Sequence, residues 1–185
     1  MTAVRNVAVV VGSLRRESLN RKMALALAAL APPSLRLNVV EIGALPHYNA
    51  DLEENPPAEW RAFRSAIKSA DAVLFVTPEY NRSVPGVLKN AIDVASRPYG
   101  QVAWEGKPGA VITVSPGAIG GFGSNHHLRQ MMVFLNVPMM QQPEAYIGNA
   151  ANLFDGEGKV AVEATRAFLQ KFVEAYAAWI AKLLS

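Results

Sequence analysis

The chain has 185 residues, enough for one domain with a buried core, and no apolar run in it approaches the roughly 18–20 residues that span a bilayer. It contains no cysteine, which excludes disulfides, thiolate metal sites and thiol redox chemistry. Its 18 Lys and Arg against 15 Asp and Glu leave a formal charge of +3, and these basic residues are scattered without interleaved aromatics, so a nucleic-acid partner is not supported. No small-residue cleavage site follows the N-terminal apolar run, and we expect a cytoplasmic protein.

The first predicted element is a strand over residues 7–11, which read VAVVV. A continuous apolar run of this kind is typical of a strand buried on both faces of a parallel sheet. Residues 12–20, GSLRRESLN, form a polar turn, and residues 22–31, KMALALAALA, are strong helix formers. A helix N-terminus leaves backbone N–H groups unpaired, and Ser, Arg and Asn side chains bind anions. The pattern therefore predicts a phosphate-binding turn.

Two common phosphate-binding motifs are excluded at this turn. The GxxxxGK[ST] spacing of a P-loop is absent, and so is the GxGxxG of a dinucleotide fold. Glu41 stands where dinucleotide-binding folds hold an acid for ribose, but without the glycines that role has little support. A turn rich in hydroxyls suits a single phosphate group. An ordinary Ser-capped helix with exposed arginines is the alternative interpretation of the same residues.

The remaining predicted elements alternate between strands and helices. The strands are expected over residues 35–42, 71–77 and 109–115, with a fifth inside 139–147, and the helices over 58–70, 87–96, 125–135 and 159–184. In the last predicted helix, four apolar residues lie on one stripe, namely Phe168, Phe172, Trp179 and Leu183. This order predicts a single α/β domain over residues 1–185, with a doubly wound, five-stranded parallel sheet of order 2-1-3-4-5 and helices on both faces.

Three unusual loops follow the first, third and fourth predicted strands. Besides the polar turn, residues 78–86, PEYNRSVPG, break regular structure, and residues 116–124, PGAIGGFGS, are too rich in glycine for a helix or strand. In a sheet of this order the ligand site lies beyond the carboxyl ends of strands 1 and 3, so the three loops are expected to meet at one crevice. Its ligand would be anionic at one end and flat at the other, where glycines let the backbone approach closely. FMN has that shape, with one phosphate, a ribityl chain and a planar ring.

Four motifs occur along the chain in a fixed order. They are GSLR with SLN inside residues 12–20, PEYN at 78–81, PGVLKNAID at 85–93, and SPG with GG inside 115–121. Together they resemble the NADPH-dependent FMN reductase family, and in particular its bacterial quinone and chromate reductases. The resemblance implies a flavodoxin-like fold, bound FMN, and NADPH or NADH as electron donor. It also implies quinones as acceptors, with chromate or ferric complexes as further ones, and a homodimer or homotetramer.

The resemblance also implies which residues hold the cofactor. The phosphate and ribityl groups would be held by Ser13, Arg15, Ser18, Leu19 and Asn20. The ring would be lined by Pro78, Glu79, Tyr80, Asn81, Ser115, Pro116 and Gly117. Hydride would pass from the nicotinamide to flavin N5 in a ping-pong cycle, so no catalytic side chain is expected, and Glu79 is expected to contribute only its backbone. Arg82 and Arg97 are candidates for attracting anionic acceptors, although such arginines are more often solvated.

A non-enzymatic electron carrier of the flavodoxin type is the main alternative function. Such carriers tend to be acidic, whereas this sequence has a pI near 9.3. No metal site is expected, because the adjacent His126 and His127 do not share a helix face and have no acidic cluster beside them. Tyr99 and Trp104 are expected to be exposed and to bury against a partner subunit.

Overall fold

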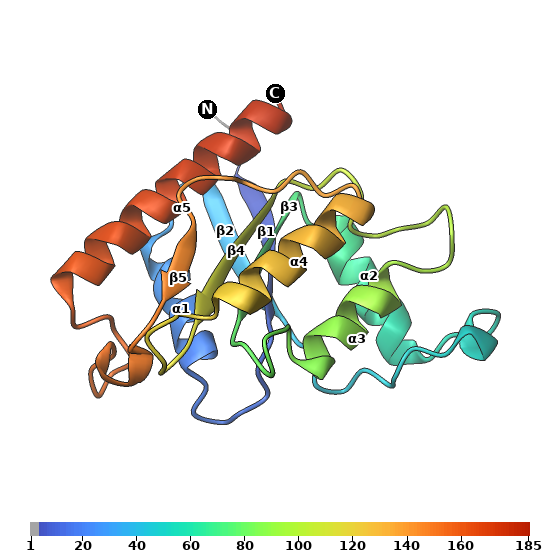
Figure 1. Ribbon diagram of the computed structural model, residues 1–185. Coiled ribbons are helices and arrows are strands. Elements are labelled where there is room, and N and C mark those ends of the chain that lie inside the picture. Colours follow the sequence, from blue (N-terminus) through green and yellow to red (C-terminus); the bar gives the residue numbers. More distant parts are fainter. Residues whose placement is uncertain (1–3) are drawn as a thin grey trace.

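The structure, a computed structural model, describes residues 4–185 (Figure 1). The strands are β1 (Arg5–Val11), β2 (Leu35–Val40), β3 (Ala72–Thr77), β4 (Gly109–Val114) and β5 (Ala145–Ile147). The α-helices are α1 (Leu19–Leu30), α2 (Ala58–Ser69), α3 (Gly86–Ala95), α4 (Phe122–Phe134) and α5 (Glu163–Leu183), and short 3₁₀ helices cover Ala50–Leu52 and Ala150–Asn152. None of the helices in this part of the chain is both long and apolar enough to cross a membrane.

The strands form one sheet of order β2-β1-β3-β4-β5, in which every neighbouring pair is parallel. The predicted doubly wound α/β fold of order 2-1-3-4-5 is therefore confirmed. In the sheet, Val9 of β1 lies opposite Val39 of β2 and Leu74 of β3. All six residues of β3 and of β4 are buried, because helices cover both faces of the sheet.

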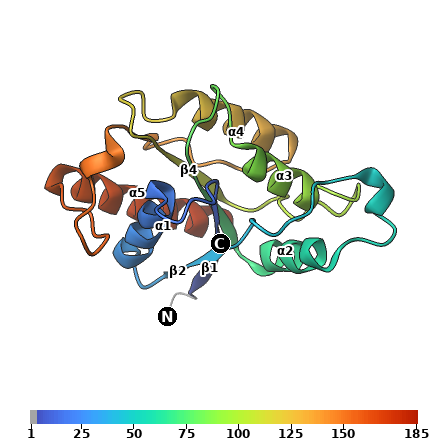
Figure 2. The same cartoon turned by 90° about the horizontal axis from the view of Figure 1, so that it is seen from below.

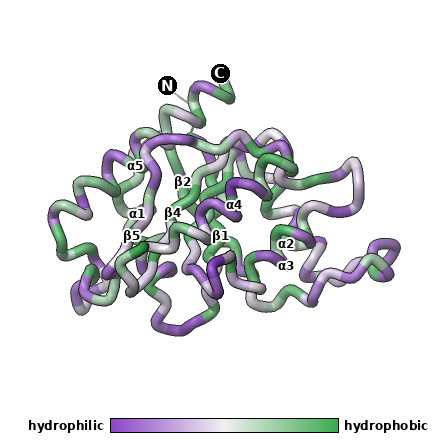
Figure 3. Tube along the Cα trace, viewed as in Figure 1, coloured by the Kyte–Doolittle hydropathy of each residue, from purple (hydrophilic) through white to green (hydrophobic). Residues whose placement is uncertain are grey.

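The helices divide between the two faces of the sheet (Figure 1 and Figure 2). α1 and α5 pack on the face that receives Val7, Val9 and Val11 of β1. α2, α3 and α4 pack on the other face, which receives Ala8 and Val10. The alternation of side chains along one strand thus builds a separate apolar core on each side of the sheet. Figure 3 shows the hydrophobic residues concentrated on the central strands, whereas the loop after β1 is mainly hydrophilic.

α4 begins at Phe122, three residues before the predicted start. Gly120 and Gly121 have φ values of 66° and 80°, which turn the chain sharply enough for the next residue to enter the helix. A Cβ on Gly120 would lie 2.7 Å from the backbone of Tyr146, so this position also needs glycine for close approach. The fifth strand is shorter than the predicted range, because only Ala145–Ile147 pairs with β4 as a strand.

α5 begins at Glu163, four residues after the predicted start. The Asp155 carboxylate accepts hydrogen bonds from the backbone N–H groups of Glu157 and Lys159, both at 2.9 Å, and holds these residues in a loop. The buried stripe of α5 also differs from the predicted one. It consists of Leu169, Phe172, Val173, Tyr176 and Ile180, whereas Phe168 and Trp179 are half-buried and Leu183 is exposed.

Trp104 lies inside the protein, so the expectation that it is exposed is wrong. Its side chain is 0% exposed and packs near Phe63 and Phe75, with ring centroids 6.0 and 5.6 Å away. The indole Nε1 donates a hydrogen bond to the carbonyl oxygen of Ile92 at 3.0 Å. Tyr99, in contrast, is 77% exposed. The segment after α3 therefore turns its tryptophan into the core and leaves its tyrosine outside.

Candidate active site

The three unusual loops meet at the carboxyl edge of the sheet, along the lower side of the molecule in Figure 1. They follow β1, β3 and β4 and enclose a pocket of about 220 Å³. Ten of the twelve predicted cofactor-binding residues line this pocket, together with Val114. They are Ser13, Arg15, Ser18, Leu19, Asn20, Pro78, Glu79, Tyr80, Ser115 and Pro116.

The start of α1 forms one end of the pocket. Ser18 is the N-cap residue, and its Oγ accepts a hydrogen bond from the backbone N–H of Arg21 at 3.2 Å. Asn20 Nδ2 donates to the carbonyl oxygen of Val114 at 3.3 Å and so ties α1 to the end of β4. Asn20 Oδ1 is buried and has no hydrogen-bond partner within residues 4–185. A buried acceptor without a partner is costly, so this atom marks a place where a bound group can donate.

Arg15 supplies positive charge at the same end of the pocket. It is exposed, and none of the ion pairs formed in the described part of the chain involves it. Arg21 instead pairs with Glu41 at 2.5 Å, and the hydrogen bond from its guanidinium lowers the pKa of the Glu41 carboxyl. Glu41, the acid at the position where dinucleotide-binding folds hold ribose, is thus paired with Arg21. Arg15 is available to bind an anion.

Gly12 lets the loop after β1 pass close to β3. A Cβ at this position would lie 2.2 Å from Thr77 Oγ1 and 2.8 Å from Thr77 Cβ, which is closer than real Cβ contacts. Gly12 N–H also donates to the carbonyl oxygen of Val76 at 2.9 Å. The path of the loop into the pocket therefore depends on the absence of a side chain here.

The loop after β3 contains a two-residue hairpin turn. Tyr80 N–H donates to the carbonyl oxygen of Ser83, and Ser83 N–H donates to that of Tyr80, both at 3.0 Å. Asn81 and Arg82 at the tip have φ values of 49° and 65°, as in a type I′ turn. This geometry directs Tyr80 to the pocket and leaves Asn81 outside its lining.

Only the backbone of Glu79 was expected to contribute to the site, and its side chain is directed to the start of α4. Its carboxylate is 13% exposed and accepts a hydrogen bond from the backbone N–H of Ser124 at 3.1 Å, in the first turn of α4. Ser124 Oγ donates to the carbonyl oxygen of Pro78 at 3.0 Å. The sequence reasoning missed Ser124, although a serine that follows a glycine-rich loop is a typical signal of a helix start.

The other predicted residues lie at the margin of the pocket or apart from it. Gly117 is exposed beside Ser115 but is not in the lining. The Arg82 guanidinium is 74% exposed and pairs with Glu79 at 3.4 Å. Arg97 lies beyond the far end of α3, about 15 Å of helix away from the hairpin turn, and borders a groove between α3 and α4. A role for Arg97 in attracting acceptors stays a prediction that its position does not favour.

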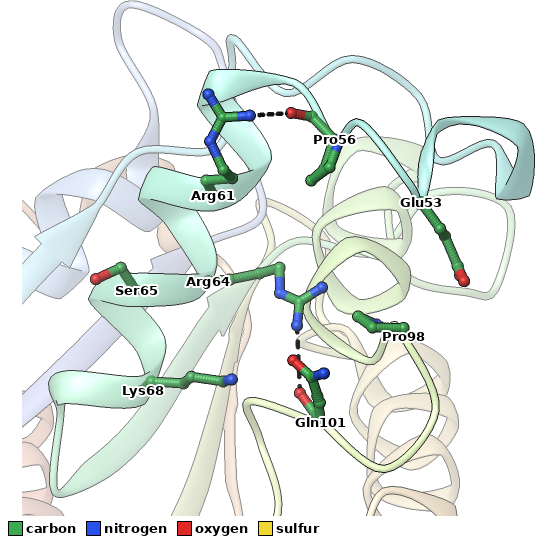
Figure 4. A pocket seen from close by; sticks show the side chains of 8 residues that line it. All are labelled: Glu53, Pro56, Arg61, Arg64, Ser65, Lys68, Pro98 and Gln101. Carbon is green, nitrogen blue, oxygen red and sulfur yellow. Dashed lines mark hydrogen bonds between the residues drawn. The ribbon is translucent and has the colours of Figure 1, made fainter.

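A larger cavity of about 470 Å³ lies beside α2 (Figure 4). Arg61, Arg64 and Lys68 line it from one face of the helix. Arg64 Nη2 donates to the carbonyl oxygen of Gln101 at 3.4 Å, and Arg61 donates to that of Pro56. None of the predicted cofactor-binding residues lines this cavity, so the pocket at the carboxyl edge of the sheet is the candidate active site.

The sequence profile of the family described as NADPH-dependent FMN reductase matches residues 5–152, which include every residue of this pocket. The chain belongs to the NADPH-dependent FMN reductase family. A relative named quinone reductase from Pseudomonas putida is 65% identical over 181 residues, 97% of each chain. The solved structure of FerB, a flavoenzyme NAD(P)H:(acceptor) oxidoreductase from Paracoccus denitrificans, is 48% identical with a TM-score of 0.92, covering 97% of this chain and 98% of FerB.

Membership of the FMN reductase family confirms the predicted enzyme class, the cofactor FMN and a reduced nicotinamide as donor. The flavodoxin-like fold is also confirmed, because a flavodoxin from Pseudomonas aeruginosa, 18% identical, superposes with a TM-score of 0.58 over 95% of this chain and 98% of the flavodoxin. The residues present suit FMN. Arg15 and two serine hydroxyls can bind one phosphate, and the unpartnered Asn20 Oδ1 can accept from a sugar hydroxyl.

Proposed function

We propose that residues 1–185 form one FMN-binding domain that passes electrons from NADPH or NADH to quinones, with FMN in the pocket at the carboxyl ends of β1, β3 and β4. The observation that carries this proposal is the convergence of the three loops on one pocket with a cationic end and an unpartnered acceptor, Asn20 Oδ1. The quinone reductase from P. putida, 65% identical, supports the choice of acceptor. When bound, FMN supplies the redox chemistry, taking a hydride from the nicotinamide and giving electrons to the acceptor.

The chain's own residues would bind and orient the cofactor. Ser13, Arg15 and Ser18 would hold the phosphate at the start of α1, where the helix dipole adds to the positive potential. Asn20 would hold the ribityl chain. The ring would lie between the segment Pro78–Tyr80 and the loop after β4, whose backbone groups can pair with its polar edge.

The test of this function is an absorption spectrum of the purified protein, followed by anaerobic addition of NADPH and then of a benzoquinone. We expect visible flavin absorption that bleaches with NADPH and returns with the quinone. Flavin absorption that NADPH or NADH does not bleach would leave the FMN site in place and favour the electron carrier. Absence of flavin absorption, even after FMN is added, would overturn the proposal.

Replacing Arg15 with alanine should weaken FMN binding about 10- to 100-fold, because a charge-assisted hydrogen bond to phosphate contributes roughly 1.5–3 kcal/mol. The dissociation constant can be measured by quenching of FMN fluorescence with the apoprotein. Arg16→Ala is the matched control, since Arg16 is the exposed neighbour and does not line the pocket. Equal FMN affinity in the Arg15 and Arg16 variants would contradict the phosphate role of Arg15.

We also propose that the protein is a homodimer formed through α4. Val133 and Phe134 on this helix are 81% and 83% exposed. Phe134 lines a groove of about 460 Å³ between α3 and α4, together with the apolar Ile92, Met131 and Leu135 and the polar or charged Tyr48, Lys89, Asp93, Ser96 and Arg97. In a twofold dimer the protruding Phe134 of each subunit would pack on the apolar side of this groove in its partner. A homotetramer would need a second interface as well.

Phe134→Glu is expected to convert the dimer to a monomer, because a charge in the centre of an apolar interface is strongly unfavourable. The mass can be measured by light scattering at micromolar concentration. Leu25→Glu is the control, since Leu25 is an exposed apolar residue on α1 and should leave the mass unchanged. A wild-type mass near the 20.0 kDa of one chain would contradict this dimer.

Chromate and ferric complexes as acceptors, and the cytoplasmic location, stay predictions.

A further inference from the structure

The Glu79 carboxylate connects the hairpin turn after β3 to the start of α4. It accepts the hydrogen bond of Ser124 N–H at 3.1 Å through Oε2, and it receives the Arg82 guanidinium at 3.4 Å through Oε1. Ser124 Oγ donates to the carbonyl oxygen of Pro78 at 3.0 Å, and His127 Nδ1 lies 3.0 Å from Ser83 Oγ. The turn is therefore attached to one helix at both of its ends.

The two segments also pack closely. A Cβ on Gly123 would lie 2.8 Å from the carbonyl oxygen of Arg82 and 3.0 Å from Glu79 Oε2, so the helix can approach the turn only because this residue is glycine. Ser124 is 0% exposed. The contact thus combines a buried hydrogen bond with a backbone approach that leaves no space for a methyl group.

The tip of the turn needs this support. Arg82 has φ of 65°, which residues other than glycine rarely adopt. Strained turns of this kind persist only when the surrounding structure holds them. Besides the two backbone hydrogen bonds between Tyr80 and Ser83, the ion pair between Arg82 and Glu79 and the close approach of Gly123 to the Arg82 carbonyl hold this turn.

We propose that Glu79 is a positioning residue, which fixes the turn at 78–83 on α4 and so sets the wall of the pocket against which the FMN ring would lie. This inference rests on the proposed function. Glu79 lines the pocket, but its carboxylate is directed to Ser124 and Arg82. It therefore acts through the backbone of Pro78 and Tyr80, and not by transferring a proton.

The first test compares Glu79→Ala with Glu79→Gln. Alanine removes the acceptor of Ser124 N–H, whereas glutamine keeps one carbonyl oxygen at the same place. We expect FMN affinity to fall about tenfold or more in the alanine variant and to stay within about threefold of wild type in the glutamine variant. The visible circular dichroism of bound FMN should change in the alanine variant and be restored in the glutamine variant, because it reports the surroundings of the ring.

Gly123→Ala tests the same contact from the other side. Alanine is the better helix former, so the change does not weaken α4 itself, but its methyl group must push the turn away. We expect the same loss of FMN affinity and the same change in circular dichroism as in Glu79→Ala. Gly86→Ala is the matched control, since Gly86 lies in the first turn of α3 and a Cβ there would meet nothing within 4 Å.

Amide hydrogen exchange separates a failure of this proposal from a failure of the proposed function. In protein without FMN, the Ser124 amide should exchange faster in Glu79→Ala than in wild type or Glu79→Gln. If wild type does not bind FMN, the proposed function fails, and the exchange rates still report on the contact. Unchanged exchange at Ser124, or faster exchange with unchanged FMN affinity and circular dichroism, would overturn the positioning role.

Discussion

Gly12→Ala is expected to weaken FMN binding about a hundredfold and to lower the free energy of unfolding by about 1–3 kcal/mol. The added methyl group would lie 2.2 Å from Thr77 Oγ1, 2.8 Å from Thr77 Cβ and 3.2 Å from Leu88 Cδ2. Since Thr77 and Leu88 are fully buried, the backbone after β1 must move instead. That movement displaces the loop from Ser13 to Asn20, five residues of which line the pocket, namely Ser13, Arg15, Ser18, Leu19 and Asn20.

The effect can be measured by FMN titration and by urea unfolding of the same variant. Gly86→Ala is again the matched control, because its methyl group enters open space at the start of a helix and should leave both quantities nearly unchanged or raise stability slightly. Wild-type FMN affinity in Gly12→Ala would show that the path of this loop does not control the site.

Trp104→Ala is expected to lower the free energy of unfolding by about 3–5 kcal/mol. The substitution removes a large, fully buried side chain from between Phe63 and Phe75 and leaves the carbonyl oxygen of Ile92 without its indole donor. The decrease in the free energy of unfolding should be the same at every protein concentration, because the contacts are within one subunit. Thermal or urea unfolding over a tenfold range of concentration measures it.

Tyr99→Ala is the control for this prediction. Tyr99 is 77% exposed, so its replacement should change the free energy of unfolding by no more than about 0.5 kcal/mol. If Trp104→Ala were as mild as Tyr99→Ala, the packing of the segment after α3 would be different from that described. FMN affinity should be retained in the folded fraction of both variants, since neither side chain lines the pocket.

The sequence alone predicted the order of the sheet and a crevice at the carboxyl ends of its strands. β1, β3 and β4 are short apolar runs without alternation, which indicates strands covered on both faces. Once the strands and helices alternate, right-handed crossovers leave few strand orders, and the carboxyl ends of β1 and β3 must form the crevice. The twelve cofactor-binding residues were implied by the family resemblance, and ten of them line the pocket at these strand ends.

The features that the sequence reasoning missed depend on contacts between distant segments. Glu79 and Ser124 are 45 residues apart and meet only because β3 and β4 are neighbours in the sheet. Trp104 lies in a short segment bounded by Gly100 and Pro108, so its local pattern indicates a surface turn, whereas the space between Phe63 and Phe75 decides its burial. Periodicity reports which face of an element is apolar, but not which side chains of other elements will fill the space beside it.

Because the Glu79 carboxylate binds the start of α4, the helix starts at the two sides of the crevice differ in how well they bind an anion. Of the helices that follow β1 and β4, α1 presents its first turn beside Arg15, whereas the first turn of α4 already holds a carboxylate of the protein. An anion that approached α4 would find the Ser124 N–H already bound to a carboxylate that Arg82 neutralises, whereas one that approached α1 would meet the positive charge of Arg15. A molecule with a single phosphate therefore has one favourable orientation.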